Sequence, residues 1–115
     1  QALQHRMVDT FMACEQTKSL LYRGLCEANK LADDASVSDL QGTLELQKSV
    51  HALKATVAKH GKLIGEEAIQ IHGGIGMTDE LNVGHFVKRL MTINVTFGDG
   101  DFHQKKFNQL SYSNI

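Results

Sequence analysis

The sequence predicts an all-α fold, an antiparallel helical bundle of two long and two short helices. Apolar residues recur at steps of three and four along most of the chain, which is the period of a helix with one apolar face. Proline, which interrupts helices, is absent from the 115 residues. No segment alternates convincingly between apolar and polar residues, so no β-sheet is expected.

The first long helix is expected from Ala2 to about Lys30, followed by a linker over Lys30–Asp39. The pattern is already helical at Gln1, with no capping residue before it, so the chain is interpreted as a fragment of a longer protein. We treat residues 1–115 as one domain. The predicted apolar stripe of this helix is Leu3, Met7, Phe11, Cys14, Leu21 and Leu25, widened by Val8 and Met12.

The second long helix is expected from about Leu40 to His72. Gly61 and Gly65 lie one turn apart within it, where glycine lowers helix propensity by about 1 kcal/mol relative to alanine. Two glycines on one face indicate that another backbone packs closely there; the alternative is a local weakness or kink. Its predicted apolar stripe is Leu46, Val50, Leu53, Val57, Ile64, Ala68 and Ile71.

A glycine-rich corner follows the second helix, because Gly73 and Gly74 can adopt the left-handed conformation that ends a helix. Thr78 is a predicted N-cap for a third, shorter helix over Val83–Ile93, with Phe86, Leu90 and Ile93 facing inward. After a loop over residues 97–100, Asp101 is a candidate N-cap for a fourth helix. That helix should end near Ser111.

Composition excludes several classes of protein. Twelve basic and thirteen acidic residues give a net charge of −1, without the basic stripe of a nucleic-acid-binding protein. No apolar run reaches the roughly 20 residues of a membrane span, and we expect a cytoplasmic protein. Cys14 and Cys26 lie roughly 18 Å apart on one helix, too far for a disulfide, and are expected to be buried thiols.

The strings QIHGGIGMTDE, GHFVKRL, FGDGD and LQHRMVDTFMACEQ resemble the C-terminal helical domain of the acyl-CoA dehydrogenases, flavoenzymes that desaturate acyl-CoA thioesters. The residues in these strings resemble most those of bacterial members of the type that includes pimeloyl-CoA dehydrogenase small subunits. The resemblance covers nearly the whole chain but only the last part of the family. Members also carry an N-terminal helical domain, a middle β-domain and one more long helix.

The resemblance implies an FAD site. In the family the Gln-x-x-Gly-Gly corner lies against the FAD of the neighbouring subunit, and a further amide contacts the adenosine part. Glycine clearance, backbone N–H groups and amide side chains suit such a ligand; the alternative is a helix C-cap with nothing bound. The implied cofactor-binding residues are Gln1, Gln70, Ile71, His72, Gly73 and Gly74.

The catalytic base is not where the resemblance places it. Many members have a glutamate immediately before the glycine that matches Gly98, and here that residue is Phe97, which cannot accept a proton. The base lies on the missing helix, comes from a partner subunit, or is absent from a catalytically silent subunit. Asp99 is a weak candidate, since Asp99 and Asp101 also suit capping of the last helix. No catalytic residue is therefore assigned.

No metal site is predicted. His72, His85 and His103 flank the corner with Asp99 and Asp101, but no pair has the tight spacing of a known metal motif. The main hypothesis is the C-terminal domain of an FAD-dependent acyl-CoA dehydrogenase, inactive as an isolated fragment, with acyl-CoA as substrate and sister subunits in a dimer or tetramer. The alternatives are a non-catalytic assembly subunit of a hetero-oligomer and a free-standing helical adaptor.

Overall fold

The computed structural model describes residues 1–33, 40–73 and 82–113, and four helices account for almost all of them. These are α1 (Ala2–Asp33), α2 (Leu40–Ile71), α3 (Asn82–Val95) and α4 (Gly100–Tyr112). Within these ranges there is no strand. The predicted all-α fold of two long and two short helices is confirmed.

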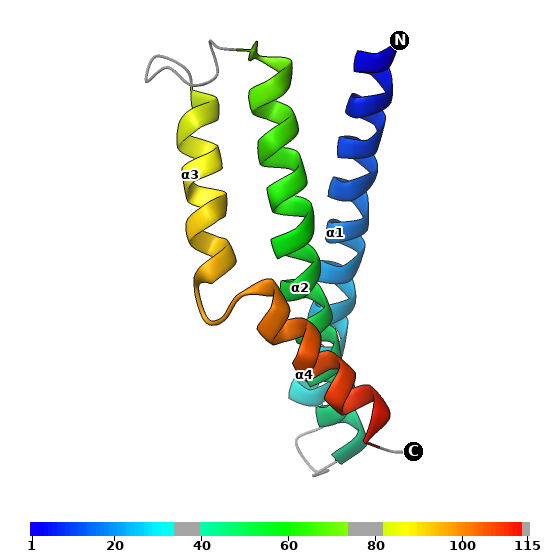
Figure 1. Cartoon of the computed structure of the whole chain (residues 1–115). Helices are drawn as coiled ribbons and strands as arrows, with labels where there is room; N and C mark the ends of the chain where they lie inside the picture. The colour runs from blue at the N-terminus through cyan, green and yellow to red at the C-terminus, as the bar shows by residue number, and fades with distance from the viewer. Residues whose placement is uncertain (34–39, 74–81, 114–115) are drawn as a thin grey trace.

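Helix α2 is the central element, and every extensive helix–helix contact in the described part of the chain involves it. Helices α1 and α3 flank α2 and run antiparallel to it, while α4 crosses its other half (Figure 1). The molecule measures 55 × 29 × 28 Å, with a radius of gyration of 17.3 Å. A compact domain of this length would have a radius of roughly 13 Å, so the arrangement is open and elongated.

The helix boundaries agree with the sequence predictions to within about three residues at most ends. Helix α1 continues to Asp33, so the described start of the predicted linker at Lys30 is helical. The prediction that Asp101 caps α4 is wrong. Asp99 is the N-cap, with extended backbone (φ −83°, ψ 179°), and Asp101 lies in the first turn. Thr78, the predicted cap of α3, lies outside the described residues.

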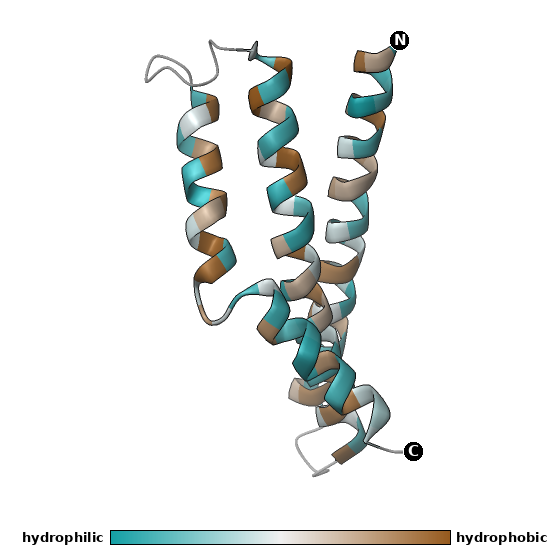
Figure 2. Cartoon of the chain, in the orientation of Figure 1, coloured by the Kyte–Doolittle hydropathy of each residue, from teal (hydrophilic) through white to brown (hydrophobic). Residues whose placement is uncertain are grey.

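The core is thin because three of the helices share one partner. Among the described residues the only buried hydrophobic side chain is Ala13, and no large side chain is fully buried. Much of the predicted α1 stripe is exposed, as is Phe86, which was wrongly expected to face inward; Figure 2 shows apolar residues along all four helices. Helical periodicity identified the apolar face correctly, but no second layer of described residues covers it. The exposed members of the α1 stripe are Leu3, Met7, Val8, Phe11, Met12, Leu21 and Leu25.

Helix α3 packs on the glycine face of α2. A Cβ on Gly61 would lie 3.5 Å from Leu90 Cδ2, and one on Gly65 would lie 3.6 Å from Val87 Cγ1. A helix does pack on this face, but the prediction that its backbone lies close is wrong, because the atoms nearest to both glycines belong to side chains. Lys54 of α2 also donates to the Ile93 carbonyl at 2.6 Å, in the last turn of α3, where a cation is favourable.

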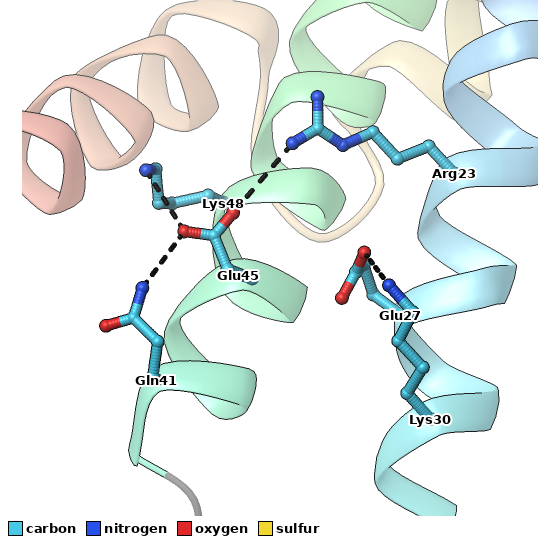
Figure 3. A network of polar contacts seen from close by, with 6 residues as sticks. All are labelled: Arg23, Glu27, Lys30, Gln41, Glu45 and Lys48. Atoms are coloured by element: carbon cyan, nitrogen blue, oxygen red, sulfur yellow. Dashed lines mark hydrogen bonds and ion pairs between the residues drawn. The ribbon is translucent and has the colours of Figure 1, made fainter.

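A polar network joins α1 to α2 near the end of α1 (Figure 3). The Glu45 carboxylate is 3.8 Å from the Arg23 guanidinium across the pair and 3.4 Å from Lys48 Nζ on its own helix. Gln41 donates to the same carboxylate at 3.4 Å. These groups are partly exposed, so the network orients the helices more than it stabilises them.

Both cysteines are free thiols, and the expectation that both are buried is wrong. Cys14 is half-buried and Cys26 is exposed. Helix α1 packs extensively only against α2, so its other faces remain open to solvent. In the described part of the chain, no helix has the length and apolar character needed to cross a membrane.

Candidate functional site

The corner at the end of α2 has the left-handed turn that the sequence predicts. Gly73 has φ +60°, and a Cβ placed on it would meet no atom of residues 1–33, 40–73 or 82–113 within 4 Å. His72 Nδ1 donates to the Ala68 carbonyl at 2.8 Å, and the same carbonyl accepts from the His72 backbone N–H at 3.2 Å. The protonated nitrogen is therefore Nδ1, and in the neutral ring Nε2 is left as an acceptor.

A cation from α1 lies at the same corner. Arg6 donates to Gln70 Oε1 at 2.8 Å, and its Nε is 3.7 Å from Glu67 Oε2. About half of the Arg6 side chain is exposed (49 %). Because Arg6 occupies the acceptor of the Gln70 amide, the N–H donors of that amide remain for a ligand; no described residue accepts from them. The corner therefore presents a guanidinium, amide donors and a glycine that no other described residue covers.

An apolar groove of about 390 Å³ leads along the α1–α2 seam to this corner. Ile71, one of the predicted cofactor contacts, is 36 % exposed and helps to line it. Both helices contribute walls, and His72 closes the end nearest the corner. The lining residues are Met7, Thr10, Phe11, Cys14, Ile64, Ala68, Ile71 and His72.

The structure brings together most of the residues that the sequence assigns to the cofactor. Gln1 is exposed at the start of α1, and because α1 and α2 are antiparallel it lies at the same end of the molecule as Gln70 and Gly73 (Figure 1). Gly74 lies outside the described residues. The antiparallel direction of the two helices thus places Gln1 and Gln70, nearly 70 residues apart in sequence, at one end of the molecule.

A family model, described as the acyl-CoA dehydrogenase C-terminal domain, matches residues 1–106. The chain belongs to this family. Searches among curated proteins and solved structures found no match. The all-helical fold agrees with an acyl-CoA dehydrogenase C-terminal domain, and the predicted resemblance is confirmed at this level.

Phe97, which the resemblance predicts to stand in place of a glutamate, lies in the loop before α4. It is the one non-glycine residue with positive φ (+61°) among those described, and 91 % of it is exposed. Its carbonyl accepts from His103 Nε2 at 3.0 Å. A bulky residue is strained in this conformation, so the loop geometry is maintained by neighbouring contacts rather than by the preference of phenylalanine.

Asp99 has a structural role in this acyl-CoA dehydrogenase domain. Its carboxylate accepts from the Phe102 backbone N–H at 2.8 Å, which satisfies a free donor at the start of α4. The carboxylate is exposed beside a shallow hollow that Lys59 and Gln104 also line. This contact agrees with the predicted alternative, in which Asp99 only caps the last helix. A role for Asp99 as the catalytic base stays a prediction.

The histidines and carboxylates near the corner separate in the fold. His72 bonds to α2 backbone, whereas His103 of α4 pairs with His51 of α2. Within residues 1–33, 40–73 and 82–113, no three metal-ligating side chains converge. Sequence reasoning missed Arg6 at the corner. Its position near the start of α1, opposite the end of an antiparallel α2, was the signal that would have placed it beside Gln70.

Proposed function

We propose that this chain is the C-terminal domain of a bacterial, cytoplasmic FAD-dependent acyl-CoA dehydrogenase, which removes hydrogen from the α and β carbons of an acyl-CoA thioester. Its family membership supports the enzyme class. The observation that carries the FAD assignment is the uncovered corner at Gly73, flanked by Gln70 and Arg6. The domain contributes this corner to a flavin site at a subunit interface.

The residues present fit a flavin dinucleotide. The proposed site allows close backbone approach at Gly73, since a Cβ there would contact no described residue within 4 Å. Arg6 offers a cation suited to a pyrophosphate, and the Gln70 amide offers donors suited to an adenosine. His72, Ile71, Gly74 and Gln1 complete the proposed set. FAD, when bound, supplies the acceptor for the substrate hydride; the corner binds and orients it.

The proposed proton abstraction needs a carboxylate that Phe97 cannot provide. We assign the base to the preceding helix of the complete enzyme or to a partner subunit, with Asp99 as the weak candidate on this chain. An Asp99→Asn variant keeps a side-chain oxygen for the cap and removes the basic carboxylate. Turnover of a saturated acyl-CoA should remain nearly intact. A kcat loss of about 10²-fold or more, with flavin bound, would instead identify Asp99 as the base.

The decisive experiment fills the space above Gly73 without straining the turn. Asparagine tolerates the left-handed conformation, so Gly73→Asn should preserve helicity and thermal stability in the protein that carries this domain with its middle domain. Flavin content, measured by absorbance, should fall. The matched control is Gly24→Ala, which also adds a Cβ in open space but lies on α1 far from the corner. Unchanged flavin content in Gly73→Asn would refute the assignment.

A second candidate function is a non-catalytic assembly subunit of a hetero-oligomeric acyl-CoA dehydrogenase. Phe97 favours it, because this subunit then needs no base of its own. Activity measured with and without candidate partner chains distinguishes the two: a subunit that turns over acyl-CoA alone excludes the second. A wild-type protein that binds no FAD under either condition would favour a helical adaptor.

Sister subunits are the proposed partners. The exposed apolar stripe of α1, including Phe11 at 65 % exposure, is the kind of surface that marks a contact with another protein. We expect the isolated chain to self-associate, which light scattering over a wide concentration range would detect. A monodisperse monomer throughout would contradict this expectation.

A further inference from the structure

Two imidazole rings connect α2 to the start of α4. His51 Nδ1 and His103 Nδ1 are 2.9 Å apart, and the ring centroids are separated by 5.1 Å. His103 is buried, with 7 % of its surface exposed. Its second nitrogen, Nε2, is 3.0 Å from the Phe97 carbonyl oxygen. The rings therefore form a chain from α2 through α4 to the strained loop at Phe97.

This geometry fixes the positions of the protons. A carbonyl oxygen only accepts, so His103 Nε2 carries a hydrogen and donates it to Phe97. In the neutral His103 ring, Nδ1 is then an acceptor, and His51 must donate its own Nδ1–H. A first proton can bind at His51 Nε2 without breaking any of these bonds. A second proton must bind at His103 Nδ1, where it faces the His51 N–H at 2.9 Å.

Burial and the surrounding charges oppose protonation of His51. Burial, then the charge of His103, then the Lys106 cation of α4 lower the pKa of His51. On α2, Lys48 is paired with Glu45, and Lys54 is directed to the carbonyl of Ile93. The loop residues Thr96 to Gly98 are uncharged.

No compensating negative charge reaches the rings. Within the described residues no carboxylate pairs with either ring, including Asp99, which is engaged as the α4 cap, and Asp101 in the first turn of α4. From α1, no described charge acts on His51; the groups that do are on α4. Two positive rings would thus face each other beside a third cation.

We propose that the His51–His103 pair is a proton-operated clamp. In its neutral or singly protonated form it fixes the start of α4 and the Phe97 carbonyl on α2, and in its doubly protonated form it releases them. The inference goes beyond the proposed enzymatic function and does not depend on it.

The direction in which stability changes with pH follows from the lowered pKa of His51 in the folded state. Because the His51 pKa is lowered on folding, the stabilisation is complete above the ordinary imidazole pKa of about 6.5. It decreases as the pH falls below that value and through the folded-state pKa. Acidification should therefore loosen α4 before it loosens the α1–α2 pair.

The test is amide hydrogen exchange of the purified chain, resolved by helix, at about pH 7.5 and about pH 5. After correction for intrinsic exchange rates, α4 protection should fall at least about tenfold, as expected for a local opening that becomes easier at the lower pH. Protection in the α1–α2 pair should change much less. Constant α4 protection would overturn the proposal.

His51→Asn is the informative variant, because its amide can occupy the Nδ1 position and either donate or accept without titrating. The fall in α4 protection should shrink to about twofold or less. His5→Asn, at an exposed position near the start of α1, should behave like the wild type. A fall in His51→Asn as large as in the wild type would refute the clamp.

Imidazole nitrogen NMR of the wild type keeps the proposal testable if His51→Asn releases α4 at every pH. At about pH 7.5 the spectra should show His103 protonated at Nε2 and His51 at Nδ1. Protonation of His103 Nδ1 should coincide with loss of α4 protection. The opposite tautomers, or a fully protonated pair with α4 still protected, would exclude the mechanism.

Discussion

Gly100→Ala is expected to weaken the contact between α4 and α2 by a steric effect of one methyl group. A Cβ on Gly100 would lie 2.8 Å from the Cβ of Ala58. Non-bonded carbons prefer about 3.5–4.0 Å, so the two atoms overlap by roughly 1 Å. The Ala55 carbonyl oxygen would lie 4.0 Å from the new Cβ, which is an ordinary contact and requires no movement. The start of α4 must therefore shift away from α2.

Overpacking of this kind costs about 1–3 kcal/mol. A small gain in helix propensity offsets part of it, since Gly100 is the first residue of α4. A double-mutant cycle with Ala58→Gly isolates the steric part. Ala58→Gly alone should cost about 1 kcal/mol of helix propensity, yet it should relieve the clash in the double variant. The expected coupling energy is about 1–3 kcal/mol.

The assay is urea unfolding followed by far-ultraviolet circular dichroism, with equal protein concentrations because the chain is expected to self-associate. Gly61→Ala is the matched control: its new Cβ would lie 3.5 Å from Leu90 and Asn94, an ordinary contact. That variant should be neutral or stabilising by up to about 1 kcal/mol. A coupling energy below about 0.5 kcal/mol between positions 58 and 100 would refute the predicted close approach.

Three further perturbations should have distinct outcomes. Lys54→Met removes the cation at the end of α3 and should cost about 1–2 kcal/mol in urea unfolding. Lys62→Met, whose Nζ is 4.0 Å from its surface partner, should cost about 0.5 kcal/mol or less; equal losses would contradict the capping role of Lys54. Gly98→Ala combines φ +102° with a Cβ 2.7 Å from the Phe102 ring and should cost about 1–3 kcal/mol; unchanged unfolding would show that the loop adapts. Lys106→Gln removes a cation that lowers the His51 pKa, so NMR titration should show that pKa raised, and an unchanged or lower value would contradict the assigned cause.

The helices were predicted well because the signals for them are local. These signals are the helical period of the apolar residues, the absence of proline and the glycines at the corner. The pair Gly61 and Gly65 even identified the face on which α3 packs. Burial was predicted poorly, because periodicity shows which side of α1 is apolar and not whether another element covers it. Phe11 illustrates the difference: it lies on the predicted stripe and is 65 % exposed.

The remaining differences between the predicted and the observed site residues have two causes. Some residues are equivalent in the local sequence, and others are brought together only by long-range packing. Asp99 and Asp101 are equally suitable caps by residue type, and only the backbone path selects Asp99. His51 and His103 are 52 residues apart and carry no shared pattern in sequence. The Gln70–Gly73 corner was predictable because a left-handed glycine is a local feature, whereas Arg6 joins it only through the antiparallel packing of α1 and α2.

The dependence of α1, α3 and α4 on α2 has a consequence for how strain spreads through the molecule. Each of these three helices makes its extensive contacts with α2 and not with the others. A 32-residue helix is about 48 Å long, and α2 carries the corner near Gly73 at its end while α4, which follows the Phe97 loop, packs on its other half. Detachment of α3 or α4 should therefore remain a local opening with its own free energy. A break within α2 would instead weaken the support of the other helices together, because all three pack on it.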